Sequence, residues 1–230
     1  MHLEEHEIHL WRVPLNVDAA QQDTMHTQFS PDETERAARF HFERDRTRFI
    51  VAHAALRQIL ARYTRKNPNA LSFRVGAYGK PTLAFETDIQ FNLSHSGNLA
   101  LIALTRGRAI GVDVESIRDN FDPLALATRF FSPPEIEDLR ACDPATRTAQ
   151  FFTLWTRKEA FIKAVGHGLS LSLSSFDISE VRGDRVRVLE SRGDYEKTDW
   201  WVKTVLREQE YVGALAVEGE EPIVHWVQDY

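Results

Sequence analysis

The sequence of 230 residues contains a single cysteine, Cys142. A lone cysteine excludes a disulfide within the chain and fits a reducing compartment such as the cytoplasm. The sequence also lacks any run of the roughly 20 apolar residues that a membrane-spanning helix requires. Its N-terminus is largely polar and acidic, unlike a secretory signal. We therefore expect a cytoplasmic protein without a membrane partner.

An excess of basic residues is also missing, because 34 acidic residues outnumber 28 lysines and arginines and give a net charge of −6. A nucleic-acid-binding domain usually carries the opposite balance, so we expect no nucleic acid partner. The hydrophobic fraction of 43% is ordinary for a soluble globular protein. We expect a monomer in which any anionic ligand is held by a local basic cluster.

Apolar residues at helical spacing predict two long helices, one starting at about residue 45 and ended by residues 67–68, the other over about residues 144–165. Gly166 is a good stop for the second. Shorter helical regions are indicated by the capping signals at Ser30 and Ser132. Apolar runs predict strands at residues 8–13, 73–75, 89–93, 99–104, 109–114, 176–178, 186–189, 200–205, 211–217 and 223–227.

The order of these elements predicts an α+β fold with two similar halves, residues 1–108 and 109–230. Each half is expected to pack one long helix on an antiparallel sheet, and a tight turn at residues 106–108 joins them. No repeat in the sequence itself links the halves, so the duplication is inferred from element order alone.

An acidic motif, Gly-Val-Asp-Val-Glu, lies at residues 111–115. On a strand, Asp113 and Glu115 point to the same side, where two carboxylates repel each other unless a cation lies between them. Oxygen ligands suit a hard ion such as magnesium. The alternative interpretation is an acidic strand edge that faces solvent.

A second motif, Trp-Thr-Arg-Lys-Glu-Ala-Phe-Ile-Lys, covers residues 155–163 on the second long helix. Glu159 and Lys163 are four residues apart, so they share one face of the helix. The alternative here is a surface ion pair worth less than about 1 kcal/mol. The aromatic residues of the motif favour a helix that is packed on two sides.

Two polar segments precede these motifs. Residues 92–97, Asn-Leu-Ser-His-Ser-Gly, follow an apolar strand and place hydroxyl and imidazole groups where phosphate oxygens could bind. Residues 78–81 form a turn with Lys80 at its tip. The alternatives are a polar turn and a solvated lysine. We reject a serine–histidine nucleophile, because adjacent residues rarely face each other and no G-x-S-x-G motif is present.

The order of these four segments resembles the 4'-phosphopantetheinyl transferases of the surfactin-synthetase-activating type. The segments that carry the resemblance are residues 79–81, 91–96, 110–115 and 152–163, and the likeness covers nearly the whole chain. It implies two halves related by a pseudo-twofold axis, with coenzyme A and magnesium in the cleft between them.

The resemblance also implies roles for single residues. It makes Asp113, Glu115 and Glu159 the magnesium ligands, and Lys163 a contact to the coenzyme A pyrophosphate. We expect Glu159 and Lys163 to be the catalytic residues, Lys163 by stabilising charge on the leaving phosphate and Glu159 as the base, directly or through a metal-bound water. The coenzyme A contacts that it implies are Arg48, Gly79, Lys80, Pro81, Ser94, His95, Lys158 and Lys163. One departure is that Asp32 and Glu33 stand where family members often carry a lysine, which leaves Arg36 as the nearest cation.

The function implied is the magnesium-dependent transfer of 4'-phosphopantetheine from coenzyme A to a serine of apo acyl or peptidyl carrier proteins, with release of 3',5'-ADP. Three alternatives remain: a magnesium-dependent nucleotide phosphohydrolase, a non-catalytic coenzyme A-binding module, and a purely structural or interaction protein. The first would release phosphate without an acceptor protein, and the third would bind no coenzyme A.

Overall fold

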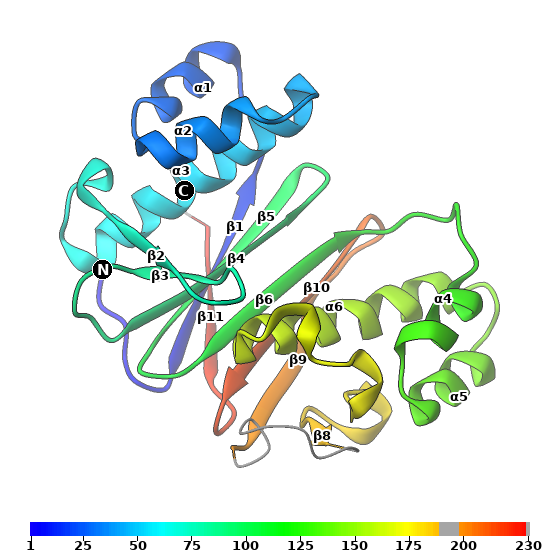
Figure 1. Cartoon of the computed structure of the whole chain (residues 1–230). Coiled ribbons are helices and arrows are strands. Elements are labelled where there is room, and N and C mark those ends of the chain that lie inside the picture. Colours follow the sequence, from blue (N-terminus) through cyan, green and yellow to red (C-terminus); the bar gives the residue numbers. More distant parts are fainter. Residues whose placement is uncertain (189–197, 229–230) are drawn as a thin grey trace.

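A computed structural model, which describes residues 1–188 and 198–228, contains two main sheets (Figure 1). The first has the strand order β11-β1-β5-β4 and the second the order β6-β10-β9. The strands of the first sheet are β1 (Glu7–Pro14), β4 (Ile89–Ser96), β5 (Leu99–Arg106) and β11 (Ile223–Val227). Those of the second are β6 (Ile110–Ser116), β9 (Trp200–Arg207) and β10 (Tyr211–Glu218).

Each sheet carries one long helix on its outer face, as predicted. Helix α3 (Glu43–Thr64) packs on the first sheet, and α6 (Arg147–Val165) packs on the second. Helix α6 ends at Gly166, whose left-handed backbone with φ of 78° explains why glycine stands there. Between the sheets lies a third apolar cluster, to which β1, β5, β6, β9 and β10 contribute. The layers are therefore helix, sheet, sheet, helix, and the predicted α+β class is confirmed.

Shorter elements surround these layers. The sequence analysis missed α1 (Ala19–His26) and α4 (Pro123–Phe130), whereas the predicted caps open α2 (Pro31–Ala38) and α5 (Pro133–Ala141). The others are β2 (Phe73–Val75), β3 (Pro81–Leu83), β7 (Phe176–Asp177), β8 (Arg187–Val188) and the single turns η1 (Pro68–Ala70), η2 (Gly168–Ser170), η3 (Leu173–Ser175) and η4 (Glu180–Arg182). The strand predicted over residues 186–189 reaches beyond the described residues. No helix among the described residues is long and apolar enough to cross a membrane.

Strand β11 does not join the sheet of its own half. It returns to the first sheet and pairs with β1, with His225 opposite His9. That pair of strands is parallel, so the first sheet is not wholly antiparallel as expected. The division of the chain at residue 108 stays a prediction, and the last strand of the second half lies in the sheet of the first.

The two sheets meet where β4 runs beside β6, and side chains bond to backbone there. Three backbone amides of β6 donate to side-chain oxygens of β4, at Val112 N to Asn92 Oδ1 (2.8 Å), Val114 N to Ser94 Oγ (3.4 Å) and Ser116 N to Ser96 Oγ (3.1 Å). We call these three bonds the β4–β6 seam. The polar turn considered for residues 92–97 is therefore wrong, because β4 continues through Ser96.

Helix α6 lies unusually close to β6 at Gly111. A Cβ atom at this position would overlap the backbone of Ala160 and Ala164 on the helix. Glycine is thus required by the close approach of two backbones. Because β6 and α6 carry the two acidic motifs, this contact sets how closely the motifs face each other.

We predict that Gly111→Ala destabilises the protein by about 3 kcal/mol or more, because backbone atoms have nowhere to move. The matched control is Gly76→Ala, where the added Cβ would meet only Lys80 O at 3.5 Å. It should change stability by less than about 0.5 kcal/mol. Urea unfolding measures both, and equal effects would contradict the role given to Gly111.

His53 is a half-buried residue of α3. Its Nδ1 lies 3.0 Å from the Phe49 carbonyl oxygen, and its ring centroid lies 3.9 Å from that of Phe49. Burial lowers the pKa of His53 from 6.5 to about 4. The folded protein therefore keeps this imidazole neutral at pH values where the unfolded chain protonates it.

This shift predicts a loss of stability in mild acid. Below pH 6.5 the His53 imidazole becomes protonated in the unfolded chain, whereas in the folded protein it stays neutral down to about pH 4. The free energy of unfolding therefore decreases as the pH falls through this window. The full loss amounts to about 3 kcal/mol. Thermal melts at several pH values should show this slope in the wild type and a shallower one in His53→Gln. Identical slopes would show that another group is responsible.

Candidate active site

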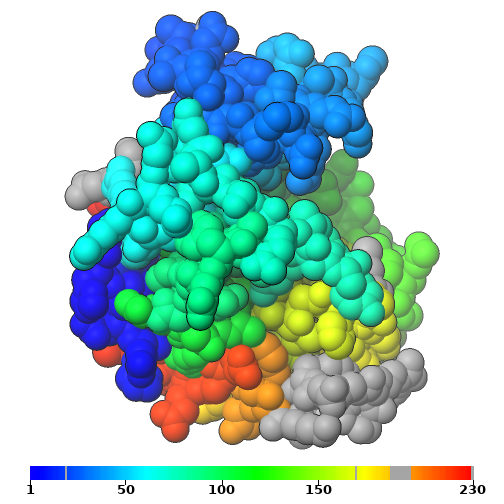
Figure 2. All heavy atoms as spheres, turned by 60° about the vertical axis from the view of Figure 1, so that its left-hand side comes forward, coloured from blue at the N-terminus to red at the C-terminus, as the bar shows by residue number. Residues whose placement is uncertain are grey.

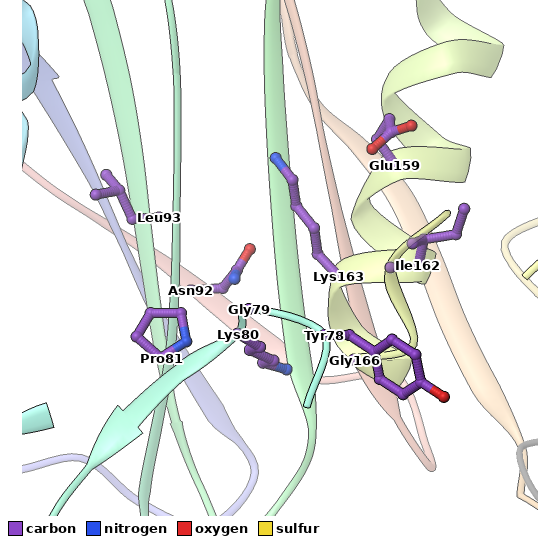
Figure 3. Close-up of a pocket in the computed structure, with 11 residues that line it drawn as sticks. Tyr78, Gly79, Lys80, Pro81, Asn92, Leu93, Glu159, Ile162, Lys163 and Gly166 are labelled. Carbon is purple, nitrogen blue, oxygen red and sulfur yellow. The ribbon is translucent and has the colours of Figure 1, made fainter. Parts of the chain in front are cut away.

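A cavity of about 300 Å³ lies between the β2–β3 turn, β4 and the C-terminal part of α6 (Figure 3). Glu159 and Lys163 enter from α6, and Asn92 and Leu93 line the side of β4. The remaining lining residues are Tyr78, Gly79, Lys80, Pro81, Ile162, Gly166 and Gly168. The structure thus gathers Gly79, Lys80, Pro81, Glu159 and Lys163 around one space, although the sequence separates them by about 80 residues.

Asp113 is the most enclosed carboxylate beside this cavity, with only 3% of its surface exposed. Its Oδ1 accepts hydrogen bonds from Lys163 Nζ at 2.6 Å and from Ser94 Oγ at 2.8 Å. Its Oδ2 is buried and has no hydrogen-bond partner among the described residues. A buried carboxylate oxygen without a partner is costly unless a ligand satisfies it. Lys163 thus forms an ion pair across to β6, so the surface pair within α6 is not the arrangement found.

The other two carboxylates, Glu115 and Glu159, are in surroundings that disfavour their charged forms. Burial, and then the negative charge of Asp113, raise the pKa of Glu115 and of Glu159. The charge of Glu115 raises the pKa of Glu159 further, while Lys163 opposes both shifts. Three carboxylates therefore repel one another around a single lysine.

The three carboxylates suit a divalent cation, since they offer oxygen atoms as ligands and one of these, Asp113 Oδ2, is buried without a hydrogen-bond partner among the described residues. However, no three His, Cys, Asp or Glu side chains among the described residues are arranged to hold a metal ion. The predicted convergence of Asp113, Glu115 and Glu159 on one point is therefore not met by the side chains as they stand. Their role as metal ligands stays a proposal.

Lys80 does not reach toward a ligand. Its Nζ donates to Ile110 O at 2.9 Å and to Ala164 O at 3.0 Å, at the start of β6 and the end of α6. Burial lowers the pKa of Lys80 to about 8. Figure 2 shows the same junction from outside, where the chain near residue 80 lies against the yellow segment that follows α6. Lys80 therefore joins β6 to α6, and its contact with the 3'-phosphate stays a prediction.

Lys158 was expected to contact the cofactor, and that prediction is wrong. Its side chain is fully buried on another face of α6, where Nζ forms an ion pair with Glu135 at 2.8 Å. It also donates to the carbonyl oxygens of Leu173 and Phe176. All three hydrogens of the ammonium group are thus used inside the protein.

A basic edge remains on the side of the first half. Arg48 donates to Asn98 Oδ1 and pairs with Asp45 at 3.3 Å. Partial burial, and then the charges of Lys163 and Arg48, lower the pKa of His95, which keeps an exposed face. Arg48 and Lys163 are therefore close enough to His95 to disfavour its protonation in the free protein.

Glu33, which seemed to displace a phosphate-binding lysine, has a structural role. It caps Ser30 at the start of α2 and accepts hydrogen bonds from the buried guanidinium group of Arg57. Arg36 lies over the ring of Phe49, with its Cζ 5.3 Å from the ring centroid. The departure from the family pattern thus anchors α2 on α3.

A second hollow, of about 380 Å³, lies at the other end of the carboxylates and was missed by the sequence analysis. Three aromatic residues of its wall come from the N-terminal part of α6, and Glu115 and Arg118 border it at the end of β6. The full lining is Glu115, Arg118, Asn120, Phe121, Leu126, Phe151, Phe152 and Trp155. The sequence analysis took the aromatic residues of α6 as evidence of helix packing, so it did not predict that they line a hollow.

The fold and the cleft define a class of α+β protein in which buried carboxylates and a lysine border a space suited to a phosphorylated ligand. Comparisons with known proteins agree with this. A family model described as the 4'-phosphopantetheinyl transferase superfamily matches residues 109–216. A second, described as the N-terminal part of a 4'-phosphopantetheinyl transferase, matches residues 17–106.

Individual relatives point the same way. The 4'-phosphopantetheinyl transferase HetI of Nostoc is 42% identical over 71% of this chain and 70% of its own. The transferase Sfp of Bacillus subtilis is 36% identical over 65% of each chain. The human L-aminoadipate-semialdehyde dehydrogenase-phosphopantetheinyl transferase is 31% identical over 67% of this chain and 54% of its own. The chain belongs to the 4'-phosphopantetheinyl transferase superfamily, which confirms the resemblance.

We predict that Lys158 and Lys163 respond differently to removal of their charge. Lys158→Met leaves the buried carboxylate of Glu135 without its cation and should lower the free energy of unfolding by about 3–5 kcal/mol. Coenzyme A affinity of the folded fraction should stay within about twofold, since the side chain does not reach the cleft. Lys163→Met should weaken coenzyme A binding about tenfold or more.

Calorimetric titration at a temperature where circular dichroism shows both variants to be folded separates the two effects. A large loss of coenzyme A affinity in folded Lys158→Met would restore the original assignment.

Proposed function

We propose that this enzyme transfers the 4'-phosphopantetheine group from coenzyme A to a serine of apo acyl or peptidyl carrier proteins, as a cytoplasmic monomer, with release of 3',5'-ADP. Family membership supports the reaction class. The observation that carries the proposal is the state of Asp113, which shares one oxygen with Lys163 and leaves the other buried without a partner among the described residues.

The two hollows suggest how coenzyme A lies. Along α6, the first cavity is at the C-terminal end, the carboxylates are in the middle and the aromatic hollow is nearer the N-terminal end. Coenzyme A has the same order of parts, a nucleotide, a pyrophosphate and a largely apolar arm. We therefore place the nucleotide toward Gly79 and Pro81, and the arm toward Phe121 and Trp155.

The basic edge would receive the 3'-phosphate. Arg48 and His95 lie on the first half near Lys163, and a phosphate there would satisfy charges that now repel one another. The lowered pKa of His95 would rise on contact with the dianion. With Lys80 and Lys158 engaged inside the protein, we assign Arg48, Lys163 and, once protonated by contact with phosphate, His95 to the nucleotide and pyrophosphate.

In the reaction, the carrier serine Oγ forms a bond to the β-phosphorus, and the bond from that phosphorus to the 3',5'-ADP oxygen breaks. Lys163 stabilises the negative charge that passes to the leaving phosphate. Asp113, Glu115 and Glu159 would hold the magnesium ion, which when bound supplies positive charge beside the phosphate oxygens. Glu159 would accept the serine proton, directly or through a water, because its carboxylate lies beside the phosphate site.

Mass spectrometry of an apo carrier protein tests the proposal. After incubation with coenzyme A, magnesium and this protein, we expect a mass gain of about 340 Da and one equivalent of 3',5'-ADP. Glu159→Gln should lower kcat by about 100-fold, the typical contribution of a general base. An unchanged mass across several carrier proteins would refute the transfer, and near-normal turnover of Glu159→Gln at saturating magnesium would refute the base alone.

A further inference from the structure

The β4–β6 seam does more than join the two sheets, because two of its side chains also donate hydrogen bonds to the carboxylates of β6. Ser94 Oγ donates to Asp113 Oδ1, and Ser96 Oγ donates to Glu115 Oε2, each at 2.8 Å. The third member, Asn92, accepts from Val112 N and holds no carboxylate. Two serines of β4 thus each donate a hydrogen bond to one carboxylate of β6.

The hydrogen-bonding capacity of each hydroxyl shows how firmly it is committed. A serine hydroxyl has one hydrogen to donate and two lone pairs to accept with. Ser94 gives its hydrogen to Asp113 and accepts from Val114 N and from Lys163 Nζ at 2.9 Å. Every capacity of this group is used within the protein, and the residue is 93% buried, since its exposed fraction is 7%. Its hydroxyl therefore has no hydrogen-bonding capacity left for a ligand, and the predicted place of Ser94 in the nucleotide wall stays a prediction.

Ser96 works in the same way at the more open end of the seam. It gives its hydrogen to Glu115 and accepts from Ser116 N at 3.1 Å. The hydroxyl of Ser116 lies 3.4 Å away and can only donate to it, because the hydrogen of Ser96 is already used. Glu115 thereby has one oxygen fixed by the protein.

We infer that Ser94 and Ser96 are positioning residues that orient Asp113 and Glu115 for a divalent cation. Like-charged carboxylates on one face of a strand would otherwise turn away from each other. A donor on one oxygen of each fixes the rotation of the carboxylate and leaves the other oxygen for a ligand. In Asp113 that other oxygen, Oδ2, is buried and has no hydrogen-bond partner among the described residues. The inference rests on the proposed function, in which these carboxylates hold the ion.

The test compares Ser96→Thr with Ser96→Val, which have the same shape and differ only in the hydroxyl. Manganese(II) serves as the probe, and its binding in the presence of coenzyme A is followed by electron paramagnetic resonance without turnover. We expect Ser96→Val to weaken manganese binding about tenfold or more, the usual effect of losing a group that orients a metal ligand. Ser96→Thr should bind within about threefold of wild type.

The exchange rates of the Val112 and Val114 amides, followed by NMR, control for damage to the rest of the seam. In Ser96→Val they should stay within about threefold of wild type, since their acceptors are Asn92 and Ser94. Equal manganese affinities for Ser96→Val and Ser96→Thr would overturn the positioning role. So would an affinity loss in Ser96→Val that is accompanied by rapid exchange of these two amides, because the loss would then reflect damage to the seam.

The outcome also separates this inference from the proposed function. If the wild-type enzyme adds about 340 Da to the carrier protein but binds no manganese in the presence of coenzyme A, the transfer is supported. The role of these carboxylates as metal ligands, and of the serines in positioning them, is then refuted. If wild type modifies no carrier yet binds manganese and loses it in Ser96→Val, the positioning stands and the transfer falls.

Discussion

The rest of the structure depends on how β6 is held between β4 and α6. On one edge, alternate amides of β6 bond to β10 in an antiparallel ladder, and the other amides bond to side chains of β4. From one side, α6 comes so close at Gly111 that no side chain fits. Lys80 then joins the start of β6 to the end of α6. The strand with two candidate ligands is therefore fixed on every side before any ligand arrives.

This rigid setting explains how the protein tolerates three carboxylates in a partly buried place. One lysine pairs with Asp113, while Glu115 and Glu159 respond to burial and to their neighbours with raised pKa values. Packing and directed hydroxyl groups keep the charges near one another at a cost that a cation and a pyrophosphate would relieve. Stability is provided elsewhere, by apolar clusters on both faces of the sheets and by buried pairs such as Glu33 with Arg57 and Glu135 with Lys158.

Much of this was predictable from local pattern. Periodicity identified α3 and α6, and motif order led to the family. What failed was non-local. Lys158 reads like its neighbours in the motif, yet helix geometry turns it toward Glu135, a residue 23 positions away. Lys80 looks like an exposed turn residue until the α6 terminus covers it. Ser96 carries no signal by itself, because its partners come from a strand 20 residues further along. The return of β11 to the first sheet likewise depends on the packing of the whole chain.

The most direct test of the account is amide hydrogen exchange along β6, resolved by NMR for the free protein. The amides of Val112, Val114 and Ser116 donate to side-chain oxygens of β4. If the seam holds, they should exchange about 100-fold or more slowly than unstructured amides, comparably with those of β6 that bond to β10. Exchange within about tenfold of the unstructured rate at these three amides alone would contradict it. The carboxylates of β6 would then not be fixed in advance of ligand binding.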